Sequence, residues 1–426
     1  MPDGTPTPLV THTLDNGLRL LVSEDHLAPV VAVNVWYDVG SRHERADRTG
    51  LAHLFEHLMF QGSRNVGPSE HFSIVQSVGG TLNGTTSFDR TNYFETVPTH
   101  AYETALWLEA DRMGTLLDAL TQENLDNQRD VVKNERRQRY DNQPYGTAWE
   151  RLFALLYPEG HPYHHLPIGS MAHLDATTLD DCRDFFQRHY APANAVLSVV
   201  GDVDPAATIA AVERYFGGIP TLAQADPAPS GDIGPRDEEV VAVTDEDVPA
   251  ETRYEVYRLP PEASAENDAA EVAFEVLAGG GASRLTRRLV RTDGVATSVS
   301  AGTQGLVGGT DVGVIVARAR SGESLDAVAA AVEEEVARLA ETGPTDDEMQ
   351  RAQARLTHGW LSGMSTAMGR ADLLNRHETL HGDAGLVDTA LTRLAAVTAE
   401  DVQAVTKRFL RPTGRAVLEY RTKATA

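Results

Sequence analysis

Apolar residues recur along the first half of the chain with two different periods. Runs rich in Val and Leu predict strands, and the turn signal Asn16-Gly17 just ahead of the first run leads us to interpret the first two runs as a hairpin. Spacings of i, i+3 and i+4 predict helices, and Gly62 is placed to end the first of them. In chain order the patterns predict strands at 18–22 and 30–39, a helix at 51–60, strands at 81–88 and 91–97, helices at 101–120 and 123–140, and a loop at 158–167.

The second half of the chain repeats part of the first. A stretch near the middle is rich in Ala, Asp, Pro, Gly and Ser, which is typical of an interdomain linker. A shift of 220 residues aligns Leu174 with Leu394, Thr178 with Thr398, Asp181 with Asp401, Arg188 with Arg408, and Pro192 with Pro412. Both copies begin a helix with Thr-x-x-Asp, a variant of the capping box. We predict two homologous α+β domains, at 1–222 and 240–426, with a linker at 223–239; chance similarity of two amphipathic helices is the alternative.

Length, composition and charge narrow the class of protein. The 426 residues exceed what one hydrophobic core usually serves, and 41% hydrophobic and 23% charged residues are typical of a globular protein. A net charge of −25 argues against nucleic acid and anionic membranes as partners and favours a cationic or neutral one. A solvated acidic surface explains the same charge without any partner.

The sequence contains no signal for a membrane or for secretion. No run of 18 apolar residues occurs, and the first ten residues hold no basic segment followed by an apolar run, so we expect a cytoplasmic protein. The single cysteine, Cys182, cannot form an internal disulfide. Because it falls in a predicted amphipathic helix, we expect a buried structural thiol.

The strongest chemical signal is the segment His53-Leu54-Phe55-Glu56-His57, an H-x-x-E-H sequence of the kind found in zinc peptidases. Residues i and i+4 share one helix face, so His53 and His57 can both present a ring nitrogen to one metal ion. Glu56 projects from the same side, while an apolar stripe lies on the other. The alternative is an accidental grouping of two histidines near a glutamate.

Two histidines need a third protein ligand, because catalytic zinc sites usually have three and a water. Glu135 is a candidate, since it lies in a long predicted helix with apolar neighbours three and four residues before it. From the residues alone, an ordinary surface glutamate in an ion pair explains Glu135 equally well.

The chain resembles the pitrilysin-type, inverzincin (M16) zinc metallopeptidases, in particular the short branch that includes mitochondrial processing peptidase. The motif itself, the segment Leu14-Asp15-Asn16-Gly17-Leu18, the segment from Gly79 to Tyr93 and the segment from Pro192 to Asp202 carry the resemblance. In that family a glutamate ligand follows the second histidine by a little under 80 residues, and Glu135 follows His57 by 78. The resemblance implies two α+β domains, each a mostly antiparallel sheet covered by helices and together half of a clam-like chamber.

The resemblance also implies roles for site residues. His53, His57 and Glu135 would hold one Zn²⁺ per chain, and Glu56 would act as general base in peptide hydrolysis. An extended peptide substrate would add to an edge strand at Asn83, Gly84, Thr85 and Thr86 through main-chain hydrogen bonds. A plain sheet strand is the alternative for that segment.

One position departs from the family pattern. Self-sufficient members carry an arginine and, seven residues later, a tyrosine that hold the substrate and oxyanion. Here Arg291 matches the arginine, but Thr297 stands where the tyrosine belongs, in a loop one residue shorter. This split favours a zinc-bearing subunit that needs a homologous partner, with a homodimer as the alternative. A silent scaffold subunit or a peptide-holding protein are the competing functions, although scaffold members typically have a broken metal motif and this chain keeps all four residues.

Overall fold

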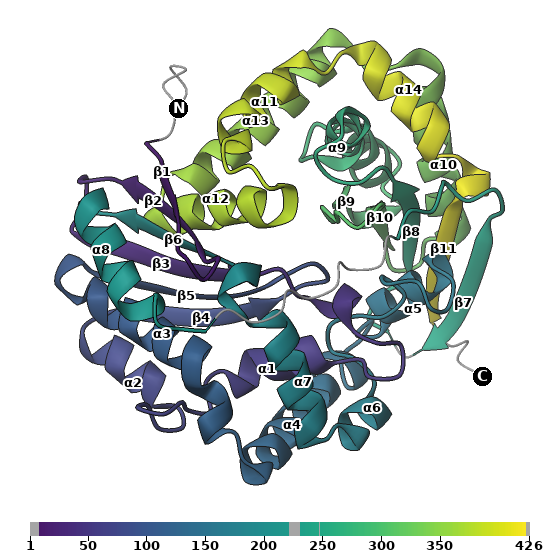
Figure 1. The fold of residues 1–426 in the computed structure, drawn as a ribbon. Helices are drawn as coiled ribbons and strands as arrows, with labels where there is room; N and C mark the ends of the chain where they lie inside the picture. The colour runs from purple at the N-terminus through teal and green to yellow at the C-terminus, as the bar shows by residue number, and fades with distance from the viewer. Residues whose placement is uncertain (1–7, 221–230, 247, 423–426) are drawn as a thin grey trace. The chain divides into compact units, whose positions relative to one another are not determined.

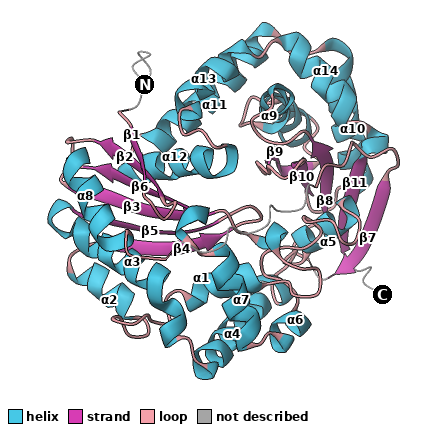
Figure 2. Ribbon diagram, in the orientation of Figure 1, coloured by secondary structure: helices cyan, strands magenta, loops and turns pink. Residues whose placement is uncertain are grey.

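The protein is described here by a computed structural model of residues 8–220, 231–246 and 248–422. It contains two β-sheets with helices packed against them (Figures 1 and 2). The first sheet has the strand order β1-β2-β6-β3-β5-β4 and the second has the order β7-β11-β8-β10-β9. The strands are β1 (Val10–Thr13), β2 (Arg19–Glu24), β3 (Val30–Tyr37), β4 (Thr81–Thr86), β5 (Thr91–Pro98), β6 (Ala195–Gly201), β7 (Val240–Glu246), β8 (Thr252–Leu259), β9 (Ala296–Thr303), β10 (Asp311–Ala319) and β11 (Arg415–Thr422).

Most of the helices in the described residues belong clearly to one sheet or the other. Those of the first sheet are α1 (Leu51–Leu58), α2 (Glu70–Ser77), α3 (Tyr102–Ala119), α4 (Gln122–Arg136), α6 (Met171–Ala176), α7 (Leu179–His189), α8 (Pro205–Phe216) and α12 (Ala367–His381). Those of the second are α5 (Ala148–Leu156), α9 (Ala265–Ala278), α10 (Leu325–Thr342) and α14 (Ala399–Phe409). Helices α11 (Asp346–Met364) and α13 (Leu386–Ala396) are each divided between the two groups.

The chain forms two compact units that do not follow the domain limits expected from the sequence. Within the described residues, the first unit combines 8–136 and 166–220 with 361–390. The second unit combines 231–360 and 391–422 with 137–165. Each half of the chain therefore contributes a helix, α12 or α5, to the unit built mainly by the other half. Residues 223–230 of the expected linker lie outside the described residues. The compact units differ from the sequence division at these two segments, because a helical pattern does not say which sheet the helix will cover.

In the first unit both sheet faces are covered. Helices α1, α3 and α8 pack on one face, where the buried side of β3 includes Tyr37. Helix α12 covers the other face, and the Trp36 Nε1 donates to Asp372 Oδ1 at 3.1 Å. Neighbouring residues of a strand point to opposite faces, which explains why both Trp36 and Tyr37 are buried.

The predicted hairpin of the first two strands is wrong. Strand β3 pairs with β5 and β6, and β2 pairs in parallel with β6, which lies between them. The Asn16-Gly17 turn instead joins β1 to β2, and Gly17 takes a φ of 89° that suits glycine. A strand from residues 195–201 displaces the local partner, a long-range pairing that no turn signal indicates.

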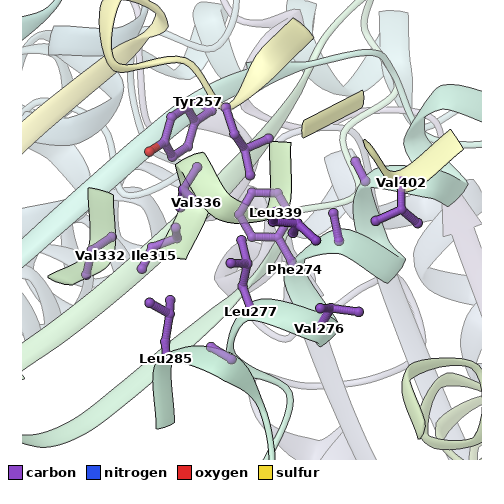
Figure 3. Packing of buried hydrophobic residues seen from close by; sticks show 14 of the residues in the cluster. Tyr257, Phe274, Val276, Leu277, Leu285, Ile315, Val332, Val336, Leu339 and Val402 are labelled. Carbon is purple, nitrogen blue, oxygen red and sulfur yellow. The ribbon is translucent and has the colours of Figure 1, made fainter. Parts of the chain in front are cut away.

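The second unit repeats the arrangement. Helices α9, α10 and α14 enclose a hydrophobic core over β8 and β10, drawn in Figure 3. The opposite face meets α5, where Arg258 Nε donates to Leu156 O at 2.9 Å. Core residues labelled in that view include Phe274, Leu277, Ile315, Val332, Val336, Leu339 and Val402. Two similar, mostly antiparallel α+β units confirm the expected fold class.

The internal repeat is visible in equivalent helices and strands. Helices α7 and α14 both begin with a complete capping box, formed by Thr178 with Asp181 and by Thr398 with Asp401. Each leads into a central strand, β6 or β11. Cys182 is buried in α7, and burial raises the pKa of its thiol to about 12, as expected for a structural cysteine. Among the described residues, no helix has the length and apolar character needed to cross a membrane.

Candidate metal centre

Helix α1 is fixed by its apolar face. Leu51, Leu54, Phe55 and Leu58 are buried, and the Phe55 ring lies 5.4 Å from the ring of Phe185 in α7. The Tyr93 hydroxyl of β5 donates to the Phe55 carbonyl at 3.2 Å. These contacts leave the histidines and glutamate of the motif on the opposite, half-buried side of the helix.

Three candidate ligand atoms lie together beside this helix. Glu135 Oε2 is 3.6 Å from His53 Nε2 and 3.3 Å from His57 Nε2. The side chains of His53, His57 and Glu135 are only 12%, 23% and 16% exposed. Ligands about 2.0–2.2 Å from a tetrahedral zinc ion are separated from one another by about 3.4 Å, so the observed spacing fits zinc. The donor set of two imidazoles and a carboxylate, without a thiolate, also suits that metal.

Helix α4 carries the carboxylate to the two histidines. Leu125, Gln128 and Val132 form its buried side, and α4 packs against α1. Arg136, next to the candidate ligand, donates from Nη1 to the Gly169 carbonyl at 3.0 Å. A Cβ on Gly169 would stand 2.4 Å from the Cα of Gly50, so the loop held by Arg136 touches the start of α1 directly. Of two polar residues earlier in the same helix, Gln128 is buried and Asp130 is exposed.

Strand β4 brings a main-chain edge to the predicted general base. Gly84 is buried, and a Cβ at this position would stand 3.2 Å from Glu56 Cγ and 3.1 Å from Tyr93 Cδ1. The glycine therefore allows the strand to lie directly against Glu56. Among the described strands β4 pairs with β5 alone, so its other edge is open.

The open edge presents alternate residues. The Ser87 N–H donates to Arg90 O at 2.8 Å, which makes these two a hydrogen-bonded pair of the antiparallel ladder. By alternation, Asn83 and Thr85 bond to β5, while the main-chain groups of Leu82, Gly84 and Thr86 face outward. The four residues predicted to pair with an extended peptide, Asn83 to Thr86, thus lie on this strand, and two of them have outward-facing main-chain groups.

Glu109 of α3 belongs to a separate cluster. It pairs with Arg112 in a buried cluster that also contains Glu95 and His71, whose Nε2 and Glu95 Oε1 are 3.1 Å apart. Burial raises the pKa of Glu109 to about 8 and lowers that of His71 to about 3. The guanidinium of Arg112 supplies the positive charge of this cluster, so we assign no metal to it. The Arg112 guanidinium also lies 4.3 Å from the centre of the Tyr93 ring. Sequence patterns gave no means to predict this contact.

Arg291 and Thr297 lie in the second unit. Arg291 is exposed at the end of the π-helical segment Thr286–Thr292, and its Nη2 lies 2.6 Å from the position that a Cβ on Gly281 would take. Thr297, in β9, donates from Oγ1 to the Arg318 carbonyl at 3.3 Å. The threonine hydroxyl is therefore engaged with its own sheet.

Histidines of the loop 158–167 pack against the residues around them. His161 stacks on Tyr157 at 4.2 Å and its Nε2 lies 2.9 Å from the Gly231 carbonyl. His164 Nδ1 lies 2.9 Å from the Tyr157 carbonyl, and both histidines are half-buried. A loop that packs on an aromatic side chain has no periodic signature, so the sequence does not indicate these contacts.

Comparison with known proteins places this geometry in a family. Residues 19–160 match the family model described as Insulinase (Peptidase family M16), and residues 176–356 match the one described as Peptidase M16 inactive domain. An uncharacterized zinc protease of Mycobacterium leprae is 30% identical over 419 residues, which are 97% of this chain and 92% of that protein. Zinc protease PqqE of Helicobacter pylori is 38% identical over 211 residues, 49% of this chain and less than half, 47%, of that protein.

A solved structure agrees over the whole chain. The crystal structure of a protease from Helicobacter pylori superposes with a TM-score of 0.91 at 26% identity, over 98% of this chain and 100% of that one. Two similar α+β units, one of which carries an H-x-x-E-H helix, define the inverzincin class of metallopeptidase folds. With relatives of this extent, the chain belongs to peptidase family M16, and the resemblance seen in the sequence is confirmed.

Proposed function

We propose that the protein is a zinc-dependent endopeptidase that cleaves unstructured peptides. The observation that supports it best is the convergence of His53, His57 and Glu135 at spacings suited to a tetrahedral ion. Glu56 supports the proposal because it precedes His57 in the same helix and lies against Gly84 of the edge strand β4. The names of the relatives as zinc proteases agree with it.

The residues present fit the proposed chemistry. His53, His57 and Glu135 would hold the zinc ion, which when bound would supply a nucleophilic water at neutral pH and polarise a carbonyl. Glu56 takes the proton of the attacking water and delivers it to the leaving amine. An extended peptide pairs with the outward main-chain groups of Leu82, Gly84 and Thr86, which gives affinity with little demand on sequence. The strand therefore holds the scissile bond beside Glu56.

We further propose that the chain is the zinc-bearing subunit of a pair. Thr297 stands at the position of the tyrosine that would hold the oxyanion. Its hydroxyl is bonded within its own sheet. A homologous subunit that carries the arginine and tyrosine would supply the missing donor and enclose the substrate in a chamber. The alternative is a homodimer in which Arg291 suffices.

A second candidate function is a peptide-holding or scaffold subunit. The match of residues 176–356 to a model described as an inactive domain favours it. That domain is the half of the chain without H-x-x-E-H, whereas the half that carries the motif retains all four residues. The first candidate therefore accounts for more of the sequence.

Peptide hydrolysis tests the proposal directly. An unstructured peptide is incubated with the wild type and with Glu56→Gln, each alone and with a homologous subunit, and products are identified by mass spectrometry. We expect cleavage by the wild type only, lost on treatment with a chelator and regained with added zinc. Binding of the peptide without cleavage by either protein would favour the holding function. Equal cleavage by both would place the base elsewhere.

A further inference from the structure

Helix α1 begins without a cap of its own. Its N-cap residue is Gly50, which has a φ of 97° and no side chain to accept a hydrogen bond from the first turn. The helix is only eight residues long, so the first-turn N–H groups that lack partners within it are a large part of its main chain. His53 is the third residue of this helix, and the candidate metal centre therefore lies close to its N-terminal end.

A carboxylate from outside the helix takes the place of the cap. Both oxygens of Glu44 accept main-chain hydrogen bonds at the start of α1: Oε2 from the Gly50 N–H at 2.9 Å and Oε1 from the Ala52 N–H at 2.7 Å. Glu44 is half-buried, and it follows directly after the short 3-10 helix η1 (Ser41–His43). A charged acceptor on two main-chain donors is among the stronger kinds of protein hydrogen bond.

The same segment is bonded to the end of the edge strand. The Ser41 N–H donates to Ser87 O at 3.2 Å and the Arg42 N–H to Phe88 O at 3.0 Å, both in the turn after β4. Arg42 Nε also lies 3.0 Å from Asp89 Oδ1, and both side chains are largely buried. Residues 41–44 therefore connect the turn that follows β4 to the start of α1, and they tie the strand to the helix that carries Glu56.

Charge gives Glu44 a second effect. The N-terminal end of a helix carries a partial positive charge, which disfavours a metal dication held on its first turns. A carboxylate bonded at that end offsets the partial charge and orients the first turn, on which His53 lies. Residues that orient metal ligands in this way typically change metal affinity by 10- to 100-fold when they are altered.

We propose that Glu44 is a positioning residue of the metal centre, one that sets the zinc affinity of His53 and His57 by capping their helix. The inference rests on the proposed zinc site but adds a residue that the H-x-x-E-H motif does not include. Glu44→Gln removes the charge and leaves only one oxygen for two N–H donors. Glu44→Asp keeps the charge on a shorter side chain.

Glu70 provides a matched control. Its Oε2 accepts a hydrogen bond from the Gly67 N–H at 2.8 Å, beside the start of α2, another helix of eight residues. Glu70→Gln thus makes the same chemical change at another helix start in the same unit. It removes a carboxylate that is bonded to main chain but has no contact with α1.

The test measures zinc affinity by competition with a chromophoric chelator, and thermal unfolding of the metal-free proteins. We expect the zinc dissociation constant to rise about tenfold in Glu44→Gln, less in Glu44→Asp, and not at all in Glu70→Gln. Wild-type zinc affinity in a folded Glu44→Gln, or an equal loss of zinc affinity in Glu70→Gln, would overturn this inference and leave the proposed function standing. If Glu44→Gln does not fold, Glu44→Asp takes its place in the test, because its shorter side chain changes the same two hydrogen bonds. Wild-type zinc affinity and an unchanged thermal unfolding transition in Glu44→Asp would then overturn the inference. Absence of zinc binding by the wild type would contradict the proposed function as well.

Discussion

At Gly84 the lack of a side chain brings strand β4 against the Cγ of Glu56. Gly84→Ala would place a methyl group 3.2 Å from that atom and 3.1 Å from the Tyr93 ring, which is tighter than most Cβ contacts. Because a small displacement of a catalytic group is costly, we expect kcat to fall on the order of ten- to a hundredfold. Zinc content should stay at the wild-type value, since no ligand is touched. Steady-state kinetics and metal analysis of the same preparation measure both.

Gly359→Ala is the control for that substitution. Gly359 lies in α11, where an added Cβ meets no atom within 4 Å. Alanine is the better helix former, so this variant should keep full activity. Wild-type kcat in Gly84→Ala would show that the strand and Glu56 are not held together as the structure has them.

The sequence revealed some residues of the candidate metal centre and not others. His53, Glu56 and His57 were predictable because a spacing of three or four residues fixes the face of a helix. Glu135 needed the family resemblance, since a distance of 78 residues has no physical meaning before the chain is folded. Glu44 was missed because its partners are main-chain N–H groups, which leave no pattern in the sequence.

At the scale of single elements, the two capping boxes give a pH-dependent prediction. The pKa of Asp401 is lowered from its ordinary 3.8, because hydrogen bonds from the main-chain N–H and the hydroxyl of Thr398 stabilise the carboxylate. A lowered pKa in the folded state gives stability that is present above the ordinary pKa and is lost as the pH falls through the lower folded value. Asp401→Asn should therefore reduce the free energy of unfolding at neutral pH and cost progressively less below pH 3.8.

Denaturant unfolding at a series of pH values measures this cost. The first copy of the box provides an independent check, because the pKa of Asp181 is lowered by its bonds with Thr178 in the same way. Thr398→Ala removes the other half of the box and should cost about 1 kcal/mol at neutral pH. A cost of Asp401→Asn that is the same at neutral and acid pH would contradict the role given to the carboxylate.

Helix α12 leads to a prediction about fragments. It covers one face of the first sheet, where Asn375 Nδ2 donates to the Asn34 carbonyl at 2.9 Å and Ser198 Oγ to the Ala371 carbonyl at 3.2 Å. Residues 1–222 by themselves lack this helix and would expose buried side chains of β3 and β6 to water. We expect that fragment to show no cooperative thermal unfolding, and a fragment fused to residues 361–390 to regain it. A cooperative transition in the unfused fragment would mean that α12 is dispensable.

The strands and helices that local periodicity predicted in the first half of the chain were found, but their partners were not predictable. Local periodicity placed β4, β5, α3 and α4 within a few residues of their observed limits, except that α4 ends at Arg136 and a π-helical turn follows. The pairing of β2 with β6 joins residues far apart in the chain, and apolar runs alone do not specify it. Helix α12 lacks a clear apolar stripe because its sheet-facing side carries polar residues, including Asn375 and Asp372, which bond to Asn34 and Trp36 of β3.

At the scale of the whole molecule, the charge of −25 should favour cationic substrates. Two peptides that differ only in their Lys or Glu content are compared at low and at high salt. We expect a higher kcat/KM for the cationic peptide at low salt, because the acidic surface attracts it. The difference should shrink in high salt, since the screening length falls to ~3 Å at 1 M. An advantage that does not change with salt would point to a specific pocket instead.

The substitution of the expected tyrosine by Thr297 predicts a weak enzyme when the chain is alone. Loss of one oxyanion donor costs about 10²–10³ in rate in comparable sites. Addition of a homologous subunit that has the arginine and tyrosine but lacks H-x-x-E-H should restore turnover. Kinetics with the oligomeric state followed by ultracentrifugation decide the question. Rapid turnover by a pure homodimer would contradict the two-subunit proposal and leave the zinc site unaffected.

The most direct test of the zinc site is the metal content of five purified proteins. Wild type and Glu56→Gln should each contain one zinc per chain, because Glu56 is a base and no ligand. His57→Ala and Glu135→Gln should be empty, since each loses one of three ligands. His100→Ala, which alters an exposed histidine of the same unit, should remain full. A full complement of zinc in His57→Ala or Glu135→Gln, or none in the wild type, would contradict the assignment.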